Sequence, residues 1–499
     1  MKKLALIVML LALHFTTAQE STTKLTVTES EEYKDKVKAN DILSIHTTES
    51  GLTGIVRNSK RDILFDIFDA NLKKVFNEVV ESDKKETFVG ELFYDNEIKF
   101  FTVYAPKKTE RIVYCHIFDI AAKTHKKVKL FETTVEKKQL LFSGQNKRQT
   151  SFAISPNGNY FAITTDNIKK NSNSYTIRVF NSNNLSLLYE KAYQEHEKRF
   201  YEHNDLSIDD NATVYGLGKL FIKGRSLKRK GDANYEFVLN KVTQSGTNDI
   251  TISLGEDEHI QSLNISIIQD ELHLLGFYSE KNVFKIKGGC NFVIDTNALA
   301  VKRKRSYELP IEVYKDLYGE NRADRKKSKG KEISNFYVDY VLQDNNGNTY
   351  ILAEEFYITQ TYVSTGTTGG YWVTTYHYDD ILIMKFDAKG ELSWGRSIFK
   401  KATAPSYNAF LKDDQLHVIL NSGKRLTEKN DGRTKVSKGF LESTALFDFV
   451  YSADGKVSYD KIQDNKGNTY YTPYFGTFEN NTFIMASDGR KKKQFMILK

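Results

Sequence analysis

The stretch Ile381-Leu-Ile-Met-Lys-Phe-Asp387-Ala-Lys-Gly390-Glu-Leu-Ser-Trp394 has the pattern of a β-hairpin: an apolar strand, an Asp/Gly turn and a second strand. Looser copies of this hairpin lie at 63–71 and 175–183. One strand-turn-strand unit cannot bury its own apolar face, so repeated copies must stack on one another. The sequence therefore predicts a repeat architecture, and it says much less about function.

The hairpin recurs along the chain, and most copies are preceded by two further strands. In 151–163 a Pro-Asn-Gly turn joins these two strands, and 337–352 repeats the arrangement around Asn346-Gly347. Four antiparallel strands per repeat are typical of a β-propeller blade. We therefore predict an all-β fold, a single β-propeller of eight four-stranded blades, with seven as the alternative because the first repeat is faint. The hairpins begin near Ile63, Ile112, Tyr175, Phe237, Phe292, Ile381, Ala445 and Gln494.

The last repeat is incomplete, because only three strands (474–478, 481–486 and 494–499) precede the end of the sequence. Residues 25–28 are the natural donor of a fourth strand, and such closure would remove an exposed sheet edge. The predicted propeller spans 19–499.

The first 18 residues have the pattern of a secretory signal peptide. Lys2 and Lys3 precede an apolar run from Leu4 to Leu13, and small residues follow at 16–18. The alternative is a short buried helix in a cytosolic protein. No later stretch approaches the roughly 20 apolar residues of a membrane span. We predict an exported protein, periplasmic or secreted, with no membrane span.

The chain contains two cysteines, Cys115 and Cys290. They could pair in an oxidising compartment, but a chain of this size does not need a disulfide to stabilise its fold. The sequence favours two separate buried thiols over one disulfide.

One blade carries a motif that resembles a known repeat. Residues 152–163, followed by 175–180, are similar to the WD40-like blade of bacterial exported propellers of the TolB type, although Asn157 replaces the usual Asp. The segment 274–357, from Leu274–Ser279 through Glu354–Tyr357, resembles uncharacterised exported propeller proteins of Gram-negative bacteria. This resemblance implies a fold and an exported location, and it implies no activity because propellers host many functions.

Basic residues gather in the loops that would join the second and third strands of each blade. These loops should lie on one face of the disc, together with a charged insertion at 311–333. A concentrated positive field attracts anionic partners; the alternative is that these charges only solvate long loops. The candidate binding residues are Lys223, Arg225, Lys228, Arg229, Lys230, Lys491 and Lys492.

The sixth repeat differs, because its second-to-third-strand connection at 357–378 lacks Lys and Arg and is rich in Tyr and Thr. It predicts a long hairpin with a Gly-rich tip. Tyr362, Tyr371, Trp372 and Tyr376 are candidate contact residues, since aromatics dominate interface energetics. Alternatively, these residues only hold the two long strands together.

The sequence lacks the common catalytic signatures. It contains no Gly-x-Ser-x-Gly elbow, and His196-Glu197 is followed by Phe200 where a zinc-binding His would stand. Asp344–Glu355 and Asp464–Asn468 are interpreted as hairpin turns rather than calcium loops. We predict no metal and no cofactor.

The sequence favours a non-enzymatic binding or scaffold protein, monomeric, whose loop-rich basic face recognises an anionic glycan, a lipid head group or an acidic protein of the cell envelope. Nucleic acid is disfavoured by the exported location. The alternative is a lyase or glycosidase with carboxylates or histidines in the central channel.

Overall fold

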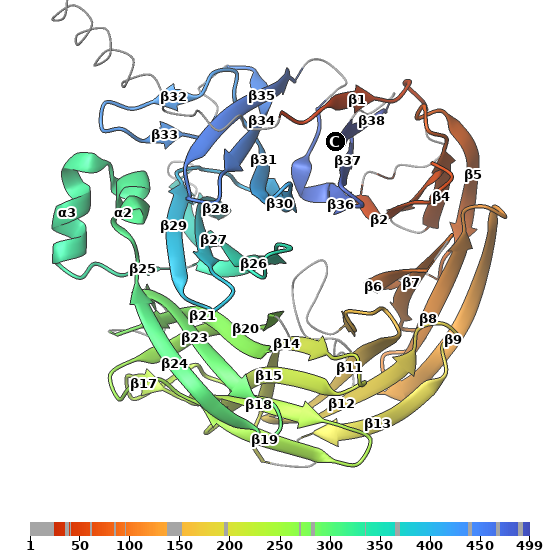
Figure 1. Ribbon diagram of the computed structural model, residues 1–499, viewed down its shortest axis with the longest axis horizontal. Helices are drawn as coiled ribbons and strands as arrows, with labels where there is room; N and C mark the ends of the chain where they lie inside the picture. Colours follow the sequence, from red (N-terminus) through yellow and green to blue (C-terminus); the bar gives the residue numbers. More distant parts are fainter. Residues whose placement is uncertain are drawn as a thin grey trace, which may run out of the picture.

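The computed structural model is a ring of eight four-stranded antiparallel sheets, the blades of a β-propeller (Figure 1). The prediction of eight blades is therefore confirmed. The structure describes residues 24–34, 39, 41–59, 62–83, 86–94, 96–136, 152–193, 198–268, 271–280, 285–334, 336–364, 370–437, 442–465, 470–487 and 493–499. The predicted signal peptide, 1–18, lies outside these residues.

The strands of a blade are called a to d here, from the innermost to the outermost. Blades one to four contain, in this order, β2 (Asp41–Thr47), β3 (Thr53–Asn58), β4 (Asp62–Phe68) and β5 (Lys74–Glu81); β6 (Thr87–Tyr94), β7 (Glu97–Tyr104), β8 (Glu110–Asp119) and β9 (Thr124–Thr134); β10 (Phe152–Ile154), β11 (Tyr160–Lys169), β12 (Ser172–Asn181) and β13 (Leu187–Tyr193); β14 (Tyr201–Ile208), β15 (Val214–Phe221), β18 (Tyr235–Val242) and β19 (Thr247–Ile252).

Blades five to eight continue the same order. They contain β20 (His259–Ile268), β21 (Glu271–Ser279), β23 (Gly288–Asp295) and β24 (Ala300–Glu308); β26 (Phe336–Gln343), β27 (Thr349–Ser364), β28 (Gly370–Phe386) and β29 (Leu392–Ile398); β30 (Tyr407–Lys412), β31 (Gln415–Gly423), β34 (Thr444–Tyr451) and β35 (Val457–Asp464); β36 (Thr477–Glu479), β37 (Thr482–Ala486), β38 (Phe495–Leu498) and β1 (Val27–Glu29).

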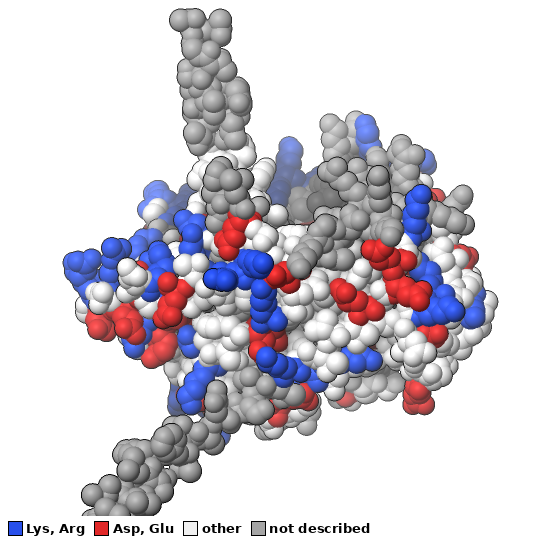
Figure 2. Space-filling view, turned by 90° about the horizontal axis from the view of Figure 1, so that it is seen from above, with Lys and Arg blue, Asp and Glu red and all other residues white. Residues whose placement is uncertain are grey.

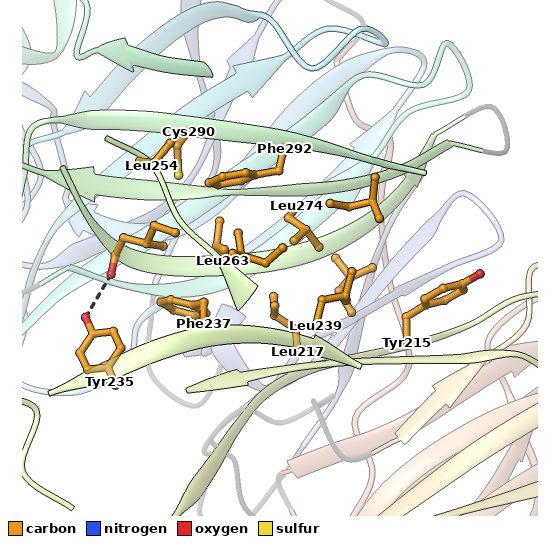
Figure 3. Packing of buried hydrophobic residues seen from close by; sticks show 14 of the residues in the cluster. Tyr215, Leu217, Tyr235, Phe237, Leu239, Leu254, Leu263, Leu274, Cys290 and Phe292 are labelled. Carbon is orange, nitrogen blue, oxygen red and sulfur yellow. Dashed lines mark hydrogen bonds between the residues drawn. The ribbon is translucent and has the colours of Figure 1, made fainter. Parts of the chain in front are cut away.

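Each predicted hairpin begins at or beside strand c of a blade, which is why the apolar run in it is nearly continuous. Strand c is buried on both faces by neighbouring blades. In β28, Leu382 and Met384 pack toward blade five, while Ile381 and Ile383 pack toward blade seven. Figure 3 shows such an interface between blades four and five, where Phe237 and Phe292 lie among aliphatic side chains. The hydrophobic cores therefore lie between blades.

The N-terminal strand β1 is the fourth strand of blade eight. It pairs antiparallel with β38, and Val27 lies opposite Leu498. Thr26 and Lys499 exchange two backbone hydrogen bonds, at 2.6 and 3.0 Å. The two ends of the described chain thus meet in one sheet.

Three buried or half-buried lysines join consecutive blades on the c–d face. Lys99 of blade two donates to the Ser182 carbonyl in the c–d turn of blade three, at 2.9 Å. Lys241 of blade four reaches the Thr296 carbonyl of blade five, at 2.7 Å. Lys385 of blade six reaches the Ala453 carbonyl of blade seven, at 3.2 Å. We call these contacts the lysine clasps. Each one satisfies a turn carbonyl with a charged donor.

Blades four to seven carry further elements on their b–c and d–a connections. These are the two-stranded ribbons β16–β17 (Lys228–Arg229 and Asp232–Ala233), β22–β25 (Lys285–Ile286 and Ile333–Ser334) and β32–β33 (Thr427–Glu428 and Thr434–Lys435), and the helices α2 (Ile311–Tyr318) and α3 (Glu320–Ser328). The helices protrude beside β29 and the β32–β33 ribbon (Figure 1). In the described part of the chain, blades one, two, three and eight have no such ribbon or helix pair.

Several details differ from the predictions. The insertion at 311–333 contains two helices, which the all-β pattern did not include. The b–c connection of blade three is a two-residue turn, 170–171, rather than a long loop. The predicted hairpin turn at 464–468 does not join strands a and b of a blade, because Asp464 ends an outermost strand; residues 466–468 lie outside the described residues. Cys115 and Cys290 are free and fully buried in different hydrophobic clusters.

Candidate functional site

The b–c connections and the d–a crossovers lie on the same face of the ring, because the strands of each blade alternate in direction. Positive charge is concentrated there. The four insertions of blades four to seven, residues 222–234, 280–287, 309–335 and 424–443, contain 21 Lys and Arg against 10 Asp and Glu. Their net charge is +11, whereas the whole chain has 72 against 64 and a net charge of +8. The rest of the protein is therefore slightly negative.

The b–c connection of blade four, residues 222–234, is the basic hairpin. It contains five basic residues and one acidic residue, Asp232. Its tip is Lys230-Gly231, with φ angles of 55° and 99°, the conformation that a two-residue turn between paired strands requires. Arg229 lies opposite Asp232 in the ribbon.

The buried amide of Asn234 fixes the path of the basic hairpin. Its Nδ2 donates to the carbonyls of Lys223 and Ser226, both at 2.7 Å. The Arg225 guanidinium lies 4.2 Å from the centre of the Phe200 ring, a cation–π contact. Ordering the loop before binding lowers the entropic cost of binding a ligand.

Three charges of the basic hairpin are available to a ligand. Lys223, Arg229 and Lys230 are exposed, and no ion pair joins them to any acidic group among the described residues. Lys228 is half-buried. The predicted residues Lys491 and Lys492 lie outside the described part of the chain.

Other basic residues of the predicted face already have partners. Arg111 is buried and donates to the carbonyls of Lys107 and Glu110, so it is not a surface charge. Arg433 pairs with Asp431 and reaches the Leu317 carbonyl. Figure 2, which views the rim of the ring, shows Lys and Arg beside Asp and Glu on the part that protrudes at the left. Among the four insertions, the basic hairpin has the largest net charge, +4 from five basic residues and one acidic residue.

The predicted hairpin of blade six is the extension of β27 and β28 beyond the blade. We call residues 356–364 and 370–378 the outer arm. Tyr376 lies opposite Ile358, and the two side chains are about half exposed. Tyr362 and Trp372 are also opposite each other, and Tyr371 lies opposite Val363. The structure thus places the four candidate contact residues on one hairpin.

A group of acidic side chains that the sequence reasoning missed lies at the base of the outer arm. We call Asp339, Glu354, Glu355, Asp379 and Asp380 the carboxyl cluster. Lys400 is its buried cation: Nζ is 2.6 Å from Glu354 Oε1 and donates to the Tyr378 carbonyl at 2.5 Å. The Lys400 backbone N–H donates to Asp380 Oδ1 at 3.2 Å.

Two tyrosines complete this network. Tyr407 donates to Asp339 Oδ2 at 2.8 Å, and Tyr357 donates to Asp379 Oδ2 at 2.9 Å. The signal available in the sequence was the pair of acidic doublets, 354–355 and 379–380, which flank an uncharged stretch. Nothing in the sequence alone placed Asp339 beside them.

Burial makes these carboxyls poor acids. Burial, with the nearby charge of Glu354, raises the pKa of Asp339 to about 7. Burial and the Asp379 charge raise the pKa of Glu355 to about 7. Burial and the charges of Glu355 and Asp379 raise the pKa of Asp380 to about 8. Such values suit groups that gain and lose protons near neutral pH.

The innermost strands also carry polar groups. His46 of β2 and Glu479 of β36 are 3.1 Å apart. Asp205 of β14 is bound by the Ile265 backbone N–H at 2.7 Å, and burial raises its pKa to about 6. Within the described ranges, no three His, Cys, Asp or Glu side chains are arranged to hold a metal ion. No described helix is long and apolar enough to cross a membrane.

Solved structures similar to this one include a WD40 domain and a β-propeller domain. The WD40 domain of SCAP from fission yeast covers 95% of this chain and 98% of its own, with a TM-score of 0.41 and 8% identity. An uncharacterised protein from Listeria monocytogenes covers 81% and 93%, with a TM-score of 0.38 and 11% identity. The β-propeller domain of the Trilobed protease from Pyrococcus furiosus covers 86% and 100%, with a TM-score of 0.38 and 10% identity.

No protein-family model matches this sequence, and no curated protein matches it. The class that the fold defines is the β-propeller, which is often used for binding or scaffolding and sometimes by enzymes.

Proposed function

We propose that this chain is an exported, non-enzymatic binding or scaffold protein that recognises an anionic partner through its b–c face. One observation carries the proposal: the insertions of blades four to seven hold a net charge of +11, while the rest of the chain is slightly negative. A field concentrated on one face speeds the encounter with anions. The leader-like residues 1–18 motivate the exported location, periplasmic or secreted.

Within that face, the basic hairpin is the proposed contact site. Lys223, Arg229 and Lys230 lack compensating ion pairs among the described residues, and Asn234 holds the loop in place. The exported location favours a sulfated or uronate glycan, an anionic lipid head group or an acidic envelope protein over nucleic acid. The aromatic outer arm would add contact area.

Retention on heparin at low salt tests the proposal. The double variant Arg229→Glu/Lys230→Glu should lose retention. The control Lys123→Glu/Lys126→Glu makes the same change in net charge at exposed residues of the blade-two c–d hairpin, on the opposite face. Equal retention of wild type and the Arg229/Lys230 variant would contradict the proposed site. Equal loss in both variants would show a response to net charge alone.

A second candidate function, a glycosidase or lyase, is favoured by the carboxyl cluster. A glycosidase needs one protonated carboxyl as acid and one carboxylate as base or nucleophile. Asp339 and Glu355, with pKa values of about 7, could each take the protonated role. Release of reducing ends from a panel of acidic polysaccharides, lost in Glu355→Gln, would support this function; no release from any of them would exclude it for those substrates.

A further inference from the structure

The outer arm is attached to the propeller through a narrow base. Strand β26 pairs with β27 only as far as Glu355, and β29 pairs with β28 only as far as Ile381. Beyond these residues, as far as the two arm strands are described, they pair with each other and with no third strand. The outer arm is therefore attached to blade six only at its base, near Glu355 and Ile381.

The ladder between β27 and β28 is interrupted at this base. Glu354 lies opposite Ile381, and the next pair is Phe356 with Tyr378. The residues skipped by the register are Glu355 on one strand and Asp379 and Asp380 on the other. Three carboxyls thus occupy the one irregular step between the blade and the arm. A local break in pairing is where a sheet bends most easily.

The contacts across the base come from the crossover that follows β29. Lys400 links the Glu354 carboxylate to the Tyr378 carbonyl, and the Tyr378 backbone N–H donates to the Ala402 carbonyl at 2.9 Å. The arm itself has no Lys, Arg, Asp or Glu between 356 and 378. The charge balance at the base is therefore set by the carboxyl cluster and its neighbours.

Those neighbours do not neutralise five carboxylates. The groups that face the cluster are Lys400 and Lys401 from the crossover, Tyr318 from α2, Tyr357 and Tyr378 from the arm, and Tyr407 from β30. His377, stacked on Tyr357 at 4.4 Å, is the other titratable group nearby. Among the described residues, two lysines face five acids, so full ionisation of the cluster leaves an excess of negative charge.

We propose that the carboxyl cluster is a pH-sensitive hinge that fixes the base of the outer arm to blade six in mild acid and loosens it progressively as the pH rises through neutrality. Protonated carboxyls can share hydrogen bonds across the irregular step. Ionised carboxyls repel one another there, and repulsion favours an arrangement in which water reaches them. This inference does not depend on what the basic hairpin binds.

The direction follows from linkage. Asp380 has a pKa of about 8 in the closed arrangement and an ordinary value of 3.8 when solvated. Because the closed arrangement holds the proton more tightly, its advantage is complete at low pH and is lost as the pH rises from about 4 to about 8. One such group changes the opening equilibrium by about tenfold for each pH unit within this window.

Hydrogen exchange at the backbone amides of Tyr378 and Lys400, which bond across the base to Ala402 and Asp380, tests the hinge once it is corrected for the intrinsic rate at each pH. We expect protection of these two amides to fall at least about tenfold between pH 5.5 and pH 7.5, while β31 and β34 of blade seven stay protected. The variant Glu355→Gln/Asp380→Asn removes two ionisable groups at similar shape and should flatten this dependence.

Two further variants make the result decisive. Asp413→Asn/Asp414→Asn changes an acidic pair in the a–b turn of blade seven and should keep the wild-type dependence. His377→Gln should also keep it, which separates the carboxyls from the arm's histidine. If blade seven loses protection in Glu355→Gln/Asp380→Asn, the single variant Asp380→Asn replaces it. Protection that is independent of pH in the wild type, or an unchanged fall in the carboxyl variant, would overturn the proposal.

Discussion

A cross-link between β1 and β38 tests whether the N-terminal strand closes the ring. Thr26 and Lys499 form a hydrogen-bonded pair, so the neighbouring pair, Val27 and Leu498, is of the non-hydrogen-bonded type. Their Cα atoms should then be about 4.5 Å apart, within the range that a disulfide spans. We predict that Val27→Cys/Leu498→Cys forms a disulfide upon mild oxidation.

The size of the effect follows from the length of the loop. The bond would close about 470 residues, for which the chain-entropy model gives a stabilisation of about 6 kcal/mol. Native-state strain reduces this figure, so a smaller gain is expected in practice. Leu498 is fully buried, and its replacement leaves a cavity. Comparison of the oxidised and the reduced form of the same variant cancels that cost.

The assay is denaturant unfolding of both forms, with mass spectrometry to verify the bond. Cys115 and Cys290 are buried and should not compete for it. The oxidised form should unfold at a clearly higher denaturant concentration. If the new thiols stay free under oxidant, or if both forms unfold together, β1 does not hold blade eight closed and the reasoning is wrong.

Three other predictions concern buried groups. Burial raises the pKa of Glu86, but hydrogen bonds from His116 and Thr102 outweigh burial and lower the pKa to about 2. The stability that this carboxylate contributes is therefore present above about pH 4.5 and is lost toward pH 2. In unfolding titrations, Glu86→Gln should remove about 3 kcal/mol of this acid dependence. Gly390→Ala should destabilise by about 1–3 kcal/mol in thermal unfolding, because φ is +73° and the added Cβ would lie 2.1 Å from the Asn291 side chain; an unchanged midpoint would contradict this packing. Burial raises the pKa of Cys115 to about 12, so a thiol reagent should modify it only in denaturant, and rapid labelling of the native protein would show that blade two is open.

The propeller could be predicted because its signal is local and repeated. Apolar runs such as 381–386 are buried on both faces, and Asp/Gly turns such as 387–390 end them. Each copy independently supports the same blade. The helices α2 and α3 carried no repeat signal, since they occur once and α3 buries only Ala323.

The site was harder to predict, because proximity across a blade is not encoded locally. Asp339 lies on strand a and meets Glu354 of strand b only after a bulge between Val338 and Tyr340 changes the side-chain phase. Arg111 shows the converse error, because the sequence predicted a surface charge and the structure buries it. It follows two lysines and resembles a surface residue in the sequence, but its side chain turns back to satisfy carbonyl groups. Both outcomes depend on three-dimensional packing, which charge counting does not capture.

Because the lysine clasps join consecutive blades, the acylation rate of these lysines can report how often neighbouring blades separate. Acylating reagents react with a solvated, neutral amine, and Lys99 is only 2% exposed while its ammonium binds the turn of the next blade. Acylation there must wait until two blades separate. Acylation rates at Lys99, Lys241 and Lys385 would therefore rank the interfaces of blades two and three, four and five, and six and seven by how often they open. One experiment on the wild-type protein would measure all three.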